Sequence, residues 1–206
     1  MRNNLFNKRM NKVILFLLIT ASAWANASDY VEGKDYRKVA GIPEVQKSVV
    51  REFFSYNCPH CYRKDPTIEK MAELIKSDIA FVRTPVGAGR ASWIMAQEAY
   101  YVANQLKITE QVHSAIFKYI HEQGGPFTSS SQLEAFFVSQ GVKQSDFEKV
   151  YNAPAKQVEL NKWEIQIQLA EIRGVPTLLV NGIYEVNPGD HSAEELAKLV
   201  EYLNKK

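Results

Sequence analysis

Cys58 and Cys61 are the two cysteines of this chain, and the dipeptide Pro59-His60 separates them. Two thiols at this spacing can form half of a zinc site, stay inert in a core, or open and close a disulfide. A zinc site needs two further ligands, and no third cysteine exists. The histidines outside the pair show no ligand spacing to one another or to the cysteines; they are His113, His121 and His191. We therefore predict a redox-active pair that binds no metal.

The residues around the pair predict a strand before it and a helix after it. Residues 48–55 are dense in valine and phenylalanine, which favour strands. Apolar residues recur at helical spacing over residues 68–75. Pro59 fits the first helical position, where a missing N–H costs nothing. Cys58 would then lie at a helix N-terminus, where free N–H groups and the helix dipole favour the reactive thiolate.

Length and composition indicate an ordinary soluble globular protein. The chain has 206 residues, enough for one core or for one domain with an insertion. Apolar residues make up 46% and charged residues 23%, and the formal net charge is +2. This charge balance gives no indication of nucleic-acid binding.

The first 27 residues have the features of a cleaved secretory signal peptide. They contain four basic residues and no acidic residue, followed by an apolar run over residues 13–19. Ala25-Asn26-Ala27 offers a cleavage site, and the apolar run is too short to span a membrane. The alternative is an uncleaved anchor. Met1 or Met10 can be the start, because the residues after Met10 still form a complete signal.

Cleavage between Ala27 and Ser28 would release the mature chain into an exported, oxidising compartment. Disulfides persist in such a compartment, yet the mature chain has no cysteine to spare for a structural bridge. Both sulfurs lie in one short loop, where a disulfide adds little to stability. This favours a catalyst of disulfide chemistry over a protein that a disulfide holds together.

The remaining segments alternate between strand and helix patterns. An edge strand is expected over residues 36–39, a second parallel strand over residues 79–84, and helices throughout residues 90–153. Residues 155–172 fit either a strand or a broad helical face, and their length and intervening Glu and Gln residues favour a helix. Two apolar runs on either side of Asn181-Gly182 predict a hairpin, and Ser192 can cap a last helix.

This order of elements describes an α/β protein with a thioredoxin fold and an inserted all-helical domain. A βαβ unit comes first and a ββα unit comes last, with helices between them. We predict a thioredoxin-like domain over residues 28–86 and 154–206, and a helical insertion over residues 87–153.

Two segments resemble the DsbA family of periplasmic thiol oxidases. The first is Glu52-Phe53-Phe54-Ser55-Tyr56-Asn57-Cys58-Pro59-His60-Cys61-Tyr62, and the second is Arg173-Gly174-Val175-Pro176, followed by Val180-Asn181-Gly182. The resemblance covers residues 28–206 in the order of elements. It is close in residue detail only in these two segments. The helical insertion is rich in aromatic residues, and Gly87-Ala88-Gly89-Arg90 has no counterpart in the family pattern.

The resemblance implies a role for each site residue. Cys58 would be the nucleophile and the more exposed sulfur of a Cys58–Cys61 disulfide, and Cys61 the buried resolving partner. Pro59 and His60 would tune the Cys58 thiolate, with a histidinium adding charge stabilisation. Val175 would offer its backbone to an extended substrate strand, and Pro176 would follow a cis peptide bond and face the cysteines.

Glu52 is a further candidate from its position in the central strand. Its strand parity matches that of its apolar neighbours Val50 and Phe54 and is opposite to that of Arg51. A buried acid has a raised pKa and could pass a proton to Cys61. The alternative is a salt-bridged residue at the end of the strand.

The leading functional hypothesis is a protein dithiol oxidase that donates the Cys58–Cys61 disulfide to reduced exported polypeptides. By resemblance, a DsbB-like membrane quinone reductase would reoxidise it, and it would need no cofactor. An isomerase or reductase of the same fold remains an alternative; the short segment before the core favours a monomer over the dimers of DsbC-type isomerases. A peptide-binding chaperone with incidental cysteines is a third hypothesis.

Overall fold

The computed structural model describes residues 30–45 and 48–206, and Val31–Lys206 form one compact unit. The expected signal peptide over residues 1–27 lies outside the described residues. No helix in the described part of the chain is long and apolar enough to cross a membrane.

Five strands form one mixed sheet in the order β1-β5-β4-β2-β3. β2 and β3 are parallel, and the β2–β4, β4–β5 and β1–β5 pairs are antiparallel. The strands are β1 (Arg37–Lys38), β2 (Val49–Phe54), β3 (Ala80–Pro85), β4 (Thr177–Val180) and β5 (Tyr184–Val186). This is the predicted α/β arrangement, with the segment before the cysteines at an inner position of the sheet.

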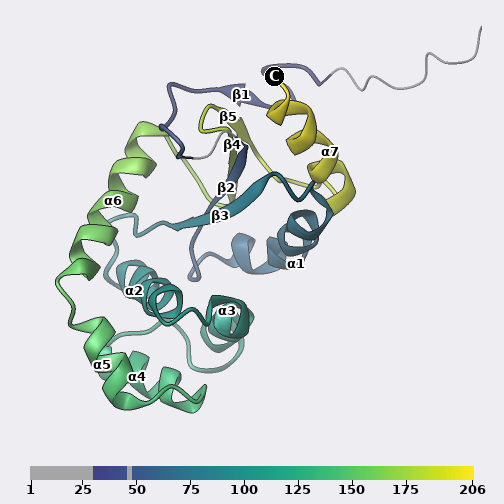
Figure 1. Cartoon of the computed structure of the whole chain (residues 1–206). Coiled ribbons are helices and arrows are strands. Elements are labelled where there is room, and N and C mark those ends of the chain that lie inside the picture. Colours follow the sequence, from purple (N-terminus) through teal and green to yellow (C-terminus); the bar gives the residue numbers. More distant parts are fainter. Residues whose placement is uncertain (1–29, 46–47) are drawn as a thin grey trace, which may run out of the picture. The chain divides into compact units, whose positions relative to one another are not determined.

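Seven α-helices and one π-helical turn accompany the sheet in the described residues. They are α1 (Pro59–Leu74), α2 (Ala91–Gln105), α3 (Thr109–Lys118), η1 (Tyr119–Gln123), α4 (Ser130–Ser139), α5 (Gln144–Tyr151), α6 (Ala155–Leu169) and α7 (Ala193–Asn204). In Figure 1, α1 and α7 lie together on one side of the sheet and α6 lies on the other.

The ambiguous segment over residues 155–172 forms a helix over Ala155–Leu169, as its length and composition favoured. The predicted hairpin is also present: β4 and β5 pair around Asn181 and Gly182, which both have positive φ. Ser192 caps α7 in a capping box with Glu195. These local predictions hold because turn and cap residues act through their own backbone geometry.

The two faces of β2 bury different residues. Phe53 packs with Leu179 and with Ala170, just after α6, whereas Phe54 packs with the helices that follow β3. The largest core cluster includes residues of α2 to α6 as well as Phe54, Tyr56 and both cysteines. The helical segment thus shares a core with the region around the cysteines.

Candidate active site

Cys58 is the N-cap of α1, as the sequence predicts. The thiol of Cys58 accepts a hydrogen bond from the backbone N–H of Cys61 at 3.5 Å, and Pro59 begins the helix. The preceding loop is held by the Cys58 N–H, which donates to the Ser55 carbonyl at 3.0 Å. This arrangement directs the amide donors of the first helical turn at one sulfur.

The two thiols differ in burial and in proton affinity. Cys58 is 5% exposed and Cys61 is fully buried, so the first sulfur is the more accessible, but only slightly. A hydrogen bond from the Cys61 thiol, with smaller effects from the backbone N–H groups of Cys61 and His60, lowers the pKa of Cys58 to about 6. Burial, together with the hydrogen bond to Cys58, raises the pKa of Cys61 above the usual thiol range. A thiolate therefore forms first on Cys58.

The loop before β4 faces Cys58. The peptide bond between Val175 and Pro176 is cis, as the resemblance implied. The Cys58 thiol lies 3.4 Å from the Val175 carbonyl, to which it can donate. In the described part of the chain, the Val175 N–H has no hydrogen-bond partner. This backbone edge is thus free to accept an added strand next to the reactive sulfur.

Pro59 and His60 are both exposed on the first turn of α1. The Arg63 guanidinium lies 2.9 Å from His60 Nδ1, and because a guanidinium can only donate, Nδ1 is the acceptor. The charge of His60 is a minor contribution to the lowered pKa of Cys58, after hydrogen bonds from Cys61 and His60. The predicted tuning by a histidinium at this position stays a prediction.

Glu52 is buried in β2 and paired with an arginine. It is 1% exposed, and Arg83 Nε on the neighbouring strand donates to its Oε2 at 2.8 Å. Burial raises the pKa of Glu52, and the charge of Arg83 opposes this only in part. The parity argument is confirmed, since Arg51 points to the other face, where it pairs with Glu44. Glu52 is therefore a buried acid with a raised pKa, as the first hypothesis predicts, and it also forms a salt bridge, as the alternative predicts.

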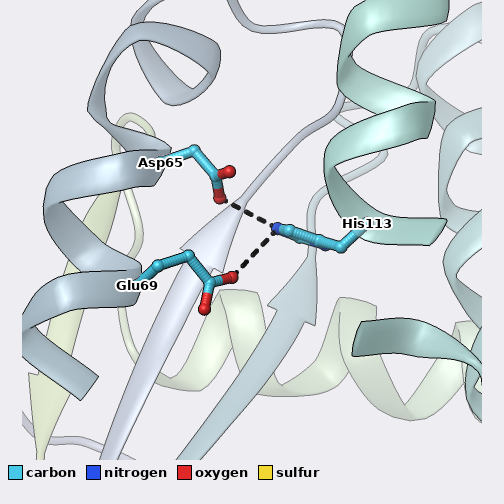
Figure 2. A group of neighbouring side chains, drawn as sticks. All are labelled: Asp65, Glu69 and His113. Atoms are coloured by element: carbon cyan, nitrogen blue, oxygen red, sulfur yellow. Dashed lines mark hydrogen bonds and ion pairs between the residues drawn. The ribbon is translucent and has the colours of Figure 1, made fainter. Parts of the chain in front are cut away.

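Arg83 also connects to a cluster that sequence spacing did not reveal. Its second bond, at 2.5 Å, goes to Glu69 of α1, and Glu69 lies 3.9 Å from His113 Nε2. Asp65, one helical turn before Glu69, lies 2.9 Å from the same nitrogen. Figure 2 shows both carboxylates of α1 directed at the imidazole of His113 on α3.

The three donor atoms of this cluster lie within 4.8 Å of one another, a spacing that could suit a metal ion. The Glu69 oxygen nearest His113 is, however, already bonded to the Arg83 guanidinium. A divalent cation would therefore be placed beside a fixed positive charge. We interpret Asp65, Glu69 and His113 as a hydrogen-bonded ion cluster in which Arg83 is the counter-ion.

Two histidines hold the loop that precedes Cys58. His113 Nδ1 lies 2.7 Å from the buried hydroxyl of Tyr56, and His121 Nε2 donates to the Tyr56 carbonyl at 2.8 Å. His121 lies in η1 and stacks on Tyr62 of α1, with 4.7 Å between ring centroids. π-Helical turns are rare in proteins, and those that occur are frequently found at functional sites. Here the turn directs His121 at the loop before the reactive cysteine.

Sequence reasoning missed both histidines because neither has ligand spacing to the cysteines. One signal was available: His113, Phe117 and His121 recur every four residues, which places them on one face of a helix. Their rings are in contact in sequence order, at 5.2 Å and 6.2 Å between centroids. The spacing does not predict which residues this helix face contacts, namely Tyr56 and Asp65.

Comparison with known proteins agrees with this geometry. The DSBA-like thioredoxin domain family matches residues 78–201. The thiol:disulfide interchange protein DsbA of Pseudomonas aeruginosa is 32% identical over 203 residues, which cover 95% of this chain and 96% of that relative. The chain belongs to the DsbA family.

Solved DsbA structures share the fold. The crystal structure of Pseudomonas aeruginosa DsbA superposes with a TM-score of 0.79 at 32% identity, covering 87% of this chain and 95% of that one. Proteus mirabilis DsbA, solved with a non-covalently bound peptide PWATCDS, gives a TM-score of 0.72 at 26% identity, covering 86% and 100%. The predicted thioredoxin-type fold and the family resemblance are both confirmed.

Proposed function

We propose that this member of a thiol:disulfide oxidoreductase family oxidises pairs of thiols in exported polypeptides by donating a Cys58–Cys61 disulfide. The observation that carries the proposal is the contrast within the pair. Cys58 has a pKa lowered to about 6 at the helix N-terminus, and burial raises the pKa of Cys61. One sulfur is thus a stabilised leaving group, and the other is shielded.

The exchange has two steps, each of which breaks and forms one bond. A substrate thiolate attacks the Cys58 sulfur, the Cys58–Cys61 bond breaks, and the Cys61 thiolate takes up a proton. A second substrate thiolate then attacks the substrate sulfur of the mixed disulfide, and Cys58 leaves as a thiolate. Two electrons pass from the substrate dithiol to the protein. The low pKa of Cys58 makes it the better leaving group in the second step.

The other site residues support these steps in proposed roles. Pro59 and His60 would tune the Cys58 thiolate from the first turn of α1. Glu52, buried on β2, would pass a proton to Cys61 when that sulfur leaves, since its raised pKa allows it to hold one. Val175, with its free N–H, and Pro176 would position the substrate backbone.

The cellular setting follows from the sequence features and the family. We propose a periplasmic protein whose signal peptide is cleaved near Ala27-Ser28 and which acts as a monomer. A DsbB-like membrane quinone reductase would reoxidise it. The thioredoxin-like part would comprise residues 28–86 and 154–206 and the insertion residues 87–153, although the two parts share a core. Bound peptide in the Proteus mirabilis relative supports polypeptide substrates.

An isomerase or reductase would use the same residues at a different redox poise. The measurement that separates them is the equilibrium of the Cys58–Cys61 pair with glutathione. An oxidase is expected well above thioredoxin at about −270 mV, towards the about −120 mV typical of DsbA. A value near that of thioredoxin would assign the protein to the reductases.

A functional assay completes the test. Oxidised protein should convert a reduced two-cysteine polypeptide to its disulfide form in equimolar amount. Cys61→Ser, activated at Cys58 as a mixed disulfide with a small aromatic thiol, should release that thiol and accumulate a mixed disulfide with a single-cysteine polypeptide, whereas Cys58→Ser should not. A chaperone with incidental cysteines predicts instead that removing both thiols leaves its activity intact.

A further inference from the structure

Two hollows meet at the backbone of the loop that faces Cys58. The larger has a volume of about 870 Å³ and lies between α1, this loop and the segment after β5. The smaller, about 320 Å³, is lined by Cys58 itself, by the segment that leads from β3 into α2, and by residues of α6 and the loop after it. Arg173, Gly174 and Val175 line both hollows. A chain lying over Val175 would therefore extend into one hollow on each side.

The larger hollow carries three basic side chains, none of which has a close acidic partner in the described chain. Arg63 contacts the His60 ring, and the Lys64 ammonium donates to the His191 carbonyl at 2.6 Å. Neither side chain has an ion pair with any residue of the described chain. Arg173 is 77% exposed in its side chain and has only a loose contact, 3.8 Å, to Glu171. Three cationic groups thus remain available at one end of the site.

The acidic residues of the same hollow do not balance this charge. Glu185 forms an ion pair with Arg37 at 2.5 Å, so its negative charge is neutralised by that arginine. Asp190 is the remaining acid of the lining, and it is exposed. The hollow therefore keeps a surplus of positive charge from Arg63, Lys64 and Arg173.

The smaller hollow is lined mainly by apolar side chains. Its walls include the side chains of Val86, Trp93, Ile167 and Ile172. The Arg90 guanidinium at this end lies over the Trp93 ring, 5.0 Å from its centroid. The smaller hollow, which Cys58 lines, is thus mainly apolar, and its charged residues are Arg90, Arg173 and the acid Glu164; the larger hollow carries Arg63, Lys64 and Arg173.

We propose that the larger hollow is a subsite for an acidic side chain of the substrate polypeptide, recognised by Arg63, Lys64 and Arg173. This deepens the proposed function and rests on it. An extended chain over Val175 advances about 3.3 Å per residue, so a residue two positions from the substrate cysteine lies about 7 Å away. A substrate residue two positions before the cysteine would thus lie in one hollow, and a residue two positions after it in the other. An acid is therefore expected to be favoured on one side of the substrate cysteine only.

The test uses reduced single-cysteine peptides and oxidised protein. Glu, Gln or Lys is placed two residues before or two residues after the cysteine, and the second-order exchange rate is measured by stopped flow. Each rate is divided by that of the same peptide with neutral hydroxyethyl disulfide, which removes effects of charge on the peptide's own thiol. At one placement, Glu should react about three- to tenfold faster than Lys at low salt, and 1 M salt should largely abolish the difference.

Matched variants locate the effect. Lys64→Gln with Arg173→Gln should remove most of the Glu preference, and both residues lie outside the pairing with His60. Lys143→Gln with Lys149→Gln removes the same charge from exposed positions around α5 and should leave the preference intact. The ratio of Glu to Lys peptides is the readout, because a general loss of stability would change both rates together.

Three results would overturn the subsite: no preference at either placement, an equal preference at both, or a preference that survives the Lys64 and Arg173 changes. An equal preference would indicate general attraction of acidic chains. If no peptide exchanges at all, the proposed oxidase function fails, and the subsite fails with it. Normal exchange without charge preference refutes the subsite alone.

Discussion

His113 Nε2 lies 2.9 Å from Asp65 Oδ1, and this contact joins the first helix after the reactive cysteine to the helical segment. The other nitrogen of His113 lies 2.7 Å from the Tyr56 hydroxyl. One buried imidazole therefore links α3 to both the active-site loop and α1. The helical segment helps to fix the loop that positions Cys58.

Replacing His113 with Phe should destabilise the protein. Asp65, 6% exposed, and the buried Tyr56 hydroxyl would each lose a hydrogen-bond partner. Stranding a buried carboxylate costs about 3–5 kcal/mol. Urea unfolding at pH 7 should show a loss of this order, and His191→Gln, at a partly exposed loop histidine, should change stability by less than about 0.5 kcal/mol. A loss as small as that of the control would refute the structural role.

The Cys58 pKa should depend on which group stands at position 61. The leading cause of the lowered value, about 6, is a hydrogen bond from the Cys61 thiol. Cys61→Ala removes this donor and should raise the Cys58 pKa, whereas Cys61→Ser supplies a hydroxyl and should retain a lowered one. Alkylation rates of reduced protein between pH 4 and 9 measure the midpoint. Equal midpoints in the Ala and Ser variants would exclude the thiol as its cause.

The sequence predicted the fold and the centre of the site because their determinants are local. The Cys-Pro-His-Cys turn, the Asn181-Gly182 hairpin and the Ser192 cap specify their geometry through neighbouring residues. The α6 segment was ambiguous because its apolar residues fit both periods. Several of these apolar residues, including Val158 and Ile165, are exposed in the structure. Their positions therefore do not mark the buried face of the helix.

The parts that the sequence left out depend on contacts between distant segments. The link from Tyr56 to His113 spans 57 positions and that from Asp65 to His113 spans 48. No spacing rule covers such pairs. The π-helical turn was also unexpected, because Tyr119 to Gln123 continue an ordinary helical pattern up to Gly124. Glu52 was predicted as a buried acid, but its partner Arg83 required the register of β2 against β3.

Replacing Glu52 with Gln should change how stability depends on pH. Burial raises the pKa of Glu52, so the folded protein disfavours its ionised form relative to the unfolded chain. Wild-type stability should therefore fall, relative to Glu52→Gln, as pH rises from the unfolded pKa through the raised folded pKa. Urea unfolding of both proteins at several pH values from 4 to 8 gives the difference. A difference that grows in favour of wild type with pH would show that pairing with Arg83 outweighs burial.

The proton role of Glu52 needs a separate measurement. If Glu52 supplies the proton to Cys61, Glu52→Gln should slow formation of the mixed disulfide, and the pH profile of that step should flatten. Glu52→Asp keeps a carboxyl group and should restore part of the pH dependence. Glu44→Gln removes the acid paired with Arg51 on the other face of β2 and serves as the matched control. An unchanged profile in Glu52→Gln would leave Glu52 a structural ion-pair residue.

The reduced protein should be more stable than the oxidised protein at pH 7. Only the reduced form carries the Cys58 thiolate, whose pKa is lowered to about 6 in the folded state. A folded pKa below the unfolded value gives a stability contribution that is complete above the unfolded pKa and is lost as pH falls through the folded pKa. For an unfolded value near 9, the contribution is about 1.4 kcal/mol at pH 7 and about 4 kcal/mol above pH 9. At pH 7 this corresponds to a redox potential about 30 mV more oxidising.

Thermal melts of both redox forms between pH 4 and 9 test this linkage. The difference in Tm between reduced and oxidised protein should shrink as pH falls through about 6 and lose its thiolate part below pH 5. The double variant Cys58→Ser with Cys61→Ser carries no thiolate, so the pH dependence of its Tm reports the titration of the other groups. Subtracting that dependence from the pH dependence of the reduced protein isolates the contribution of the Cys58 thiolate. An oxidised form that is the more stable at pH 7, with a gap independent of pH, would contradict stabilisation by the Cys58 thiolate. It would also favour the reductase alternative, because the disulfide would then be the preferred state of the pair.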